Sequence, residues 1–154
     1  MLDNVIFSLI KGLPFSIKKK LLENHKCPKK AIDNLKISLR EVNSKTGLKI
    51  LNQINSTSIV EKAEKIIQQC VESEIRIIPY WHDFYPKDLI HCTDAPFLIY
   101  TKGEQNPNTQ NLISIVGTRN CTDYGLKEIK RILNYLKSYP IGIVSGLAYG
   151  IDIY

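Results

Sequence analysis

The sequence has no apolar run that approaches the roughly 20 residues needed to cross a bilayer. Its first residues carry an acid, Asp3, where a secretory signal would carry Lys or Arg, and no small-residue cleavage site follows. Only 8 of the 154 residues are Gly and 7 are Pro, while 44% are hydrophobic, which argues against disorder or a fibrous repeat. We therefore expect a cytoplasmic protein with no membrane partner, folded as one compact domain or two small ones.

Cysteine is scarce and scattered, and no C-x-x-C pair is present. The four cysteines are Cys27, Cys70, Cys92 and Cys121. A zinc site of paired ligands is therefore not expected, nor is a disulfide framework in a protein that is not exported. His82 and His91 lie near Cys92 in the sequence, but no pattern places the three on one face. We predict no metal site and no cofactor.

The sequence has fewer acidic than basic residues, 15 against 21, and the difference is larger in its first half. Residues 1–75 contain 13 basic and 8 acidic side chains, a difference of +5, whereas residues 76–154 contain 8 and 7, a difference of +1. The formal charge of +6 is compatible with a nucleic-acid partner. Solvated lysine faces are common, so motifs must identify that partner.

The first half of the chain carries apolar residues at helical spacing. Stripes over 5–10, 15–24 and 47–55 predict short helices, and a further helix begins at Ser58. Ser58 and Glu61 have the spacing of a capping box, followed by an apolar stripe that ends at Val71. We predict a small helical domain of four or five helices over residues 1–74.

The second half, residues 75–154, changes to short strands. Runs at 75–78 and 97–100 are rich in β-formers and are bounded by Pro and Gly. Apolar runs at 112–116 and 141–144 predict strands buried on both faces. An amphipathic helix lies between them, with Leu126, Ile129, Ile132, Leu133 and Leu136 expected to point inward. This order predicts a parallel βαβ unit with a right-handed crossover.

Two glycine-containing loops follow the apolar strands, at 117–125 and 145–152. Both leave at the carboxyl edge of a parallel sheet, where open α/β folds bind ligands. Small residues there let backbone amides approach a phosphate, and a following helix N-terminus favours an anion. Arg119 can fork two phosphate oxygens and Thr118 can donate a hydroxyl, while Tyr124 or Tyr149 can offer a ring face to a base.

Catalytic motifs are absent from these loops. Ser145 stands between Val144 and Gly146, so it is not the nucleophile of a G-x-S-x-G elbow. Neither a P-loop nor the dinucleotide fingerprint is present, and no carboxylate pair stands at helical spacing nearby. We predict no catalytic residue.

Five motifs follow one another in the second half of the chain. They are Tyr85-Pro86-x-x-Leu89, Asp94-Ala95-Pro96-x-Leu98-x-Tyr100-x-x-Gly103, Ile115-Val116-Gly117-Thr118-Arg119, Tyr124-Gly125, and Ser145-Gly146-Leu147-Ala148-x-Gly150-Ile151-Asp152. In order and spacing they resemble the DprA/Smf family of DNA-processing proteins. The resemblance covers about residues 75–152. It implies an α/β fold with a sterile-alpha-motif-like or helix-hairpin-helix-like domain before a Rossmann-like domain that is truncated here, because the family continues beyond Asp152.

What the resemblance implies is a non-enzymatic protein. Such proteins bind and protect single-stranded DNA, load the RecA recombinase during natural transformation, and form homodimers at full length. Carried over to this sequence, Gly117, Thr118 and Arg119 match a phosphate-contacting Gly-Ser-Arg turn, with Thr in place of Ser. The nucleic-acid-binding candidates are completed by Tyr124, Gly125, Ser145, Gly146, Ala148 and Gly150, with Asp152 in a structural role. The alternative is a nucleotide-binding or phosphoribohydrolase-like enzyme on a related scaffold.

Overall fold

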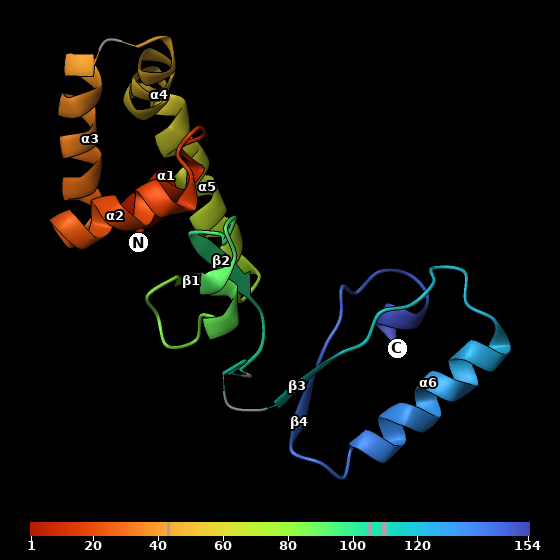
Figure 1. Ribbon diagram of the computed structural model, residues 1–154. Helices are drawn as coiled ribbons and strands as arrows, with labels where there is room; N and C mark the ends of the chain where they lie inside the picture. The colour runs from red at the N-terminus through yellow and green to blue at the C-terminus, as the bar shows by residue number, and fades with distance from the viewer. Residues whose placement is uncertain (43, 105, 109–110) are drawn as a thin grey trace. The chain divides into compact units, whose positions relative to one another are not determined.

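The computed structural model describes residues 1–42, 44–104, 106–108 and 111–154 (Figure 1). It is an α/β structure, as the sequence predicts. The chain forms two compact units that divide near residue 105. Helices make up most of the first unit, and the second is built from two strands and one long helix. Within the described ranges, no helix has the length and apolar character that crossing a bilayer requires.

The first unit begins with five helices. They are α1 (Leu2–Leu9), α2 (Phe15–His25), α3 (Pro28–Val42), α4 (Lys45–Asn55) and α5 (Thr57–Glu72). Four of them are at the places that the apolar stripes predict. The fifth, α3, has a stripe of its own, since Ala31, Ile32 and Leu35 are all buried. The prediction of a small bundle of four or five helices is therefore confirmed.

The predicted N-cap of α5, Ser58, is wrong by two residues. Ser56 is the N-cap, and its hydroxyl accepts a hydrogen bond from the Ser58 amide at 3.2 Å. Ser58 therefore lies inside the first turn and cannot be the cap of a capping box with Glu61. The prediction that the apolar stripe extends to Val71 is also wrong, because Val71 is 74% exposed whereas Ala63 and Cys70 are buried.

Two antiparallel strands complete the first unit, β1 (Arg76–Pro79) and β2 (Leu98–Thr101). Ile77 and Leu98 belong to the same buried cluster as the helices, and the Phe97 ring meets the edge of Phe7 with centroids 5.1 Å apart. The sequence places a domain boundary at residue 75, where helices give way to strands. The structure instead has β1 and β2 share the helical core, and its compact units divide near residue 105.

The second unit is the predicted βαβ arrangement. The strand β3 (Asn111–Ser114) leads through α6 (Asp123–Leu136) to β4 (Ile141–Val144), and a short 3-10 turn, η2 (Ile151–Ile153), follows. The two strands are parallel, with Asn111 opposite Ile141 and Ser114 opposite Val144. Figure 1 shows α6 running beside this strand pair.

The prediction that both strands are buried on both faces is wrong. All four residues of β3 are exposed, and β4 is no more than half-buried. On α6 only Ile129 is buried, and Ile132 is exposed. Two strands and one helix cannot cover both faces of a sheet, so an apolar run that is typical of a central strand remains accessible here.

Candidate nucleic-acid interface

Two loops meet at the carboxyl ends of β3 and β4. The first covers residues 115–122 and the second residues 145–150. The Ile115 amide donates to the Val144 carbonyl at 2.9 Å, which extends the strand pairing by one residue. Farther along, the Ile151 amide donates to the Thr118 carbonyl at 3.2 Å. The loops that the sequence assigns to one sheet edge therefore lie together.

Asp152 connects the two loops. Its carboxylate Oδ1 accepts a hydrogen bond from the Gly117 amide at 2.9 Å, so it holds the start of the first loop. The Ser145 hydroxyl donates to the Asp152 main-chain carbonyl at 2.7 Å. The same hydroxyl accepts from the Leu147 amide at 3.3 Å, which closes the start of the second loop. Ser145 and Asp152 thus hold the loops in shape.

Two glycines are required by the close approach of the loops. A Cβ on Gly117 would overlap the Ile151 side chain. Gly150 has φ +94, and a Cβ there would overlap the carbonyl oxygen of Thr118 and the backbone of Arg119. Any other residue at position 150 would face both the unfavourable backbone conformation and this overlap. Both positions were singled out by the motif, and their contacts explain why glycine stands there.

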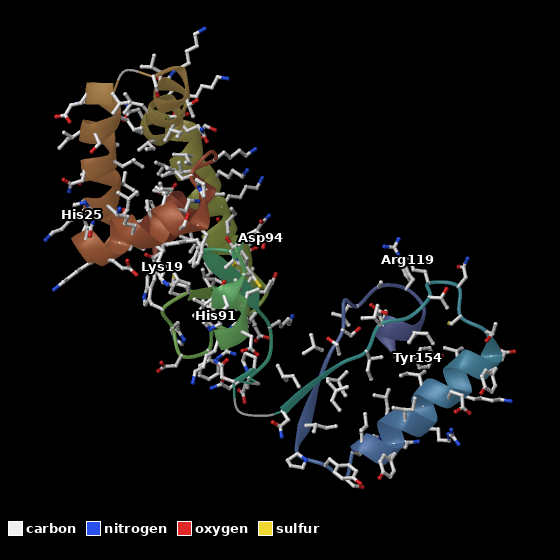
Figure 2. All side chains as sticks on the ribbon, viewed as in Figure 1. Lys19, His25, His91, Asp94, Arg119 and Tyr154 are labelled. Carbon is white, nitrogen blue, oxygen red and sulfur yellow. The ribbon has the colours of Figure 1, made fainter. Side chains whose placement is uncertain are left out.

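The first loop presents Thr118 and Arg119 differently. The Thr118 hydroxyl forms its hydrogen bonds within the loop. It accepts from the Asn120 amide at 3.2 Å and donates to the Asn120 carbonyl at 3.3 Å. Arg119 is exposed, and Figure 2 shows its side chain projecting away from the ribbon. Among the residues that the structure describes, Arg119 forms no ion pair with Asp123 or Asp152. Its guanidinium is thus accessible to an anion.

Both loops also carry backbone donors that no acceptor in the described part of the chain engages. The amides of Arg119, Gly146 and Ala148 have no acceptor among the described residues. Amides of successive loop residues form anion-binding concavities in many proteins. The helix α6 begins close by, with Thr122 as its N-cap accepting from the Gly125 amide at 3.2 Å.

The two candidate rings are both accessible. Tyr124, in the first turn of α6, and Tyr149, in the second loop, are exposed, Tyr149 by 82%. A Cβ on Gly125 would lie 3.6 Å from the Ile151 side chain, so the first turn of α6 lies close to η2. The backbone of Leu147 takes a left-handed conformation with φ 51, which the sequence does not predict. Nothing in its sequence signals this, since Leu disfavours that conformation.

The local chemistry favours binding. The charge of residues 106–154 is +2, from five basic and three acidic side chains. All three histidines of the chain lie before residue 92, so Ser145 has no imidazole base in its own unit. In the described ranges, no group of three or more His, Cys, Asp or Glu side chains is arranged to hold a metal ion.

Comparison with known proteins agrees with the motifs. The sequence profile of the family "DNA recombination-mediator protein A" matches residues 76–154, which include both loops. The chain belongs to this family. Its relatives include the DNA processing protein DprA of Streptococcus pneumoniae, 39% identical over 70 residues that cover 46% of this chain and 24% of that protein.

Two further relatives have the same family names. The DNA processing protein DprA of Bacillus subtilis is 34% identical over 92 residues, covering 59% of this chain and 31% of that protein. Protein Smf of Escherichia coli is 33% identical over 76 residues, covering 49% and 20%. The chain therefore matches between a fifth and a third of the length of these relatives. The names of these relatives describe DNA-processing proteins, and the family description names a recombination mediator.

Proposed function

We propose that this chain binds single-stranded DNA without cleaving it, through the two loops at the carboxyl edge of the β3–β4 pair. The observation that carries the proposal is that, among the described residues, two loops whose backbones approach closely carry an exposed, unpaired Arg119 in one and the unpartnered amides of Gly146 and Ala148 in the other. A guanidinium and backbone N–H groups are donors that suit phosphate oxygens. Phosphate is common to all nucleotides, so this binding has no sequence preference.

Exposed aromatic rings favour a single strand over a duplex. Tyr124 and Tyr149 offer ring faces to bases, and bases are available for stacking only when they are unpaired. Gly117, Thr118, Gly125, Ser145 and Gly150 act in this proposal by shaping the loops, and Asp152 by bracing them.

The wider role follows from the family. We propose that the bound strand is protected and passed to the RecA recombinase during natural transformation, in the cytoplasm, by a protein that forms homodimers at full length. In this proposal the five helices are a sterile-alpha-motif-like domain, and the β3–α6–β4 unit is the beginning of a Rossmann-like domain. The parallel strand pair with ligand-facing loops at its carboxyl edge supports the second assignment.

The test is fluorescence anisotropy with labelled oligo-dT and with a duplex of equal length, each at two salt concentrations. We expect weak binding that favours the single strand and weakens as salt rises, because phosphate contacts release counterions. Tighter duplex binding, or binding that does not respond to salt, would contradict the proposal. Hydrolysis of a nucleoside 5′-monophosphate by the chain would favour the alternative, a phosphoribohydrolase-like enzyme.

A further inference from the structure

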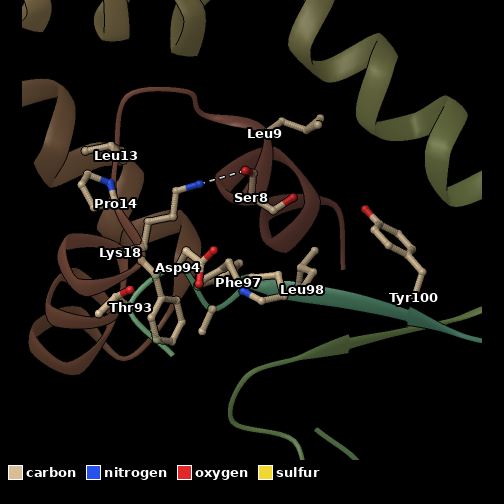
Figure 3. A pocket seen from close by; sticks show the side chains of 13 residues that line it. Ser8, Leu9, Leu13, Pro14, Lys18, Thr93, Asp94, Phe97, Leu98 and Tyr100 are labelled. Atoms are coloured by element: carbon tan, nitrogen blue, oxygen red, sulfur yellow. Dashed lines mark hydrogen bonds between the residues drawn. The ribbon is translucent and has the colours of Figure 1, made fainter. Parts of the chain in front are cut away.

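A cavity of about 570 Å³ lies within the first unit, between the end of α1, the start of α2 and the segment that leads into β2. Figure 3 shows it from close by. Its walls are mainly apolar and include Leu9, Leu13, Phe15 and Phe97. Cavities of this size and character are typical of small-molecule sites. The loops of the second unit take no part in it.

One charged side chain in this cavity is nearly completely buried. Lys18 is 6% exposed, and its Nζ donates to the Ser8 carbonyl at 2.8 Å, as the dashed line in Figure 3 marks. Ser8 lies in the last turn of α1, where carbonyls lack helical partners, so this bond caps the helix. An ammonium has three N–H donors, and this bond uses one of them. Among the described residues Lys18 forms no ion pair.

The charge of Lys18 is therefore poorly compensated. Burial lowers its pKa from 10.5 to about 8. The other ionisable groups that line the cavity are Asp94, which is exposed at its rim, and Tyr100, whose pKa is raised by burial. A buried charge without a partner is costly, and an anion that reaches it recovers part of that cost.

We propose that this cavity is a binding site for a small apolar monocarboxylic acid, whose carboxylate pairs with the Lys18 ammonium while its body lies on the apolar walls. A single ammonium balances one negative charge. The exposed Asp94 carboxylate repels a doubly charged phosphate about twice as strongly as a singly charged acid, and no arginine is among the described residues that line the cavity. The site is separate from the DNA-binding loops, so either proposal can fail without the other.

The experiment is an NMR titration of the whole chain, with the lysine Cε resonances followed as 3-phenylpropanoate is added. We expect saturable binding that raises the pKa of Lys18 from about 8 toward its ordinary value, because the carboxylate stabilises the charged form. The uncharged analogue 3-phenylpropanol and the dianion phenyl phosphate should bind at least tenfold more weakly. Equal or tighter binding of either analogue, or no saturable change with the acid, would overturn the proposal.

Variants locate the site. Lys18→Met should weaken 3-phenylpropanoate binding at least tenfold, whereas Lys20→Met, on the exposed side of the same helix, should leave it unchanged. Thr93→Phe is a second variant, because Thr93 is exposed at the cavity and the larger ring would block it without removing the Lys18–Ser8 bond. Binding that survives Thr93→Phe in a folded protein would place the acid elsewhere and refute the assignment.

Discussion

Arg119 is the only arginine in either loop, it is exposed, and it forms no ion pair within the described part of the chain. Replacing it with Ala should weaken single-strand binding by about 1.5–3 kcal/mol, because a charge-assisted phosphate contact is lost. The slope of log Kd against the logarithm of the salt concentration should also fall by about one, because one phosphate contact is lost. Anisotropy with oligo-dT measures both. Lys127→Ala, on the exposed face of α6, is the control, and equal affinity of the two variants would contradict the role of Arg119.

A substitution at Gly150 tests whether the stability of the second unit depends on the close approach of the two loops. Gly150→Ala should destabilise the second unit by more than the roughly 1–2 kcal/mol that a left-handed backbone costs, because the new Cβ would also overlap the Thr118 carbonyl. Gly103→Ala is the matched control, since Gly103 has φ +97 but no atom within 4 Å of the added Cβ. Thermal unfolding followed by the NMR signals of each unit gives the comparison. Equal losses in the two variants would refute the overlap.

Lys18 gives the first unit a pH dependence. Its pKa in the folded chain is about 8, below the unfolded value, so between these two values the unfolded chain binds more protons. The free energy of unfolding should therefore rise as pH rises above about 8, by roughly 3 kcal/mol at most over the full interval. Urea unfolding at pH 7 and pH 9.5, followed by the fluorescence of Trp81, measures this. Lys18→Met should remove the rise, and a rise that persists in the variant would assign it to other groups.

At the scale of elements, Ser56 and Ser58 have different roles at the start of α5. Ser56→Ala should destabilise the first unit by about 1 kcal/mol, because the Ser58 amide loses its acceptor. Ser58→Ala should change the free energy of unfolding by less than about 0.5 kcal/mol, since only the amide of Ser58 takes part in the cap. Urea titrations of the two variants give the ranking, and the reverse order would restore the capping box predicted from the sequence.

The same element shows what sequence patterns can and cannot predict. The stripe at Ala63 and Cys70 locates α5, because helical spacing is a local property. Its cap was misplaced because Ser56 and Ser58 are equally good caps, and the turn from α4 decides between them. The apolar run in β3 correctly predicts a strand, but burial depends on what covers it, and that is a non-local property.

In the candidate site, too, local features could be predicted from the sequence and non-local contacts could not. Gly117, Arg119 and Gly150 could be selected from their motif, and parallel strands predict that their loops share one edge. The brace formed by Asp152 with Gly117 joins residues 35 positions apart, and no local pattern specifies that bond. Lys18 could not have been found at all, because a lysine in a helix is expected to be solvated, and its burial depends on residues outside α2, among them Ser8, whose carbonyl accepts from its Nζ.

At the scale of the whole molecule, stability is unevenly distributed. The large buried cluster of the described chain lies entirely in the first unit, from Val5 to Leu98, and joins helices to β1 and β2. Among its described residues, the second unit has one buried hydrophobic side chain, Ile129, and a strand pair of four residues each. Buried apolar area supplies most of the free energy of folding, so the two units should differ greatly in stability.

Hydrogen exchange followed by mass spectrometry should show this difference. Amides of α5 should exchange at least tenfold more slowly than those of β3 and β4, because opening the second unit exposes little apolar surface. Oligo-dT should slow exchange in the second unit only, since a ligand stabilises the part that binds it. Slowest exchange in residues 112–145 would show that the ranking is inverted. Protection by oligo-dT confined to the helices would instead move the DNA contact to the more basic first half of the chain.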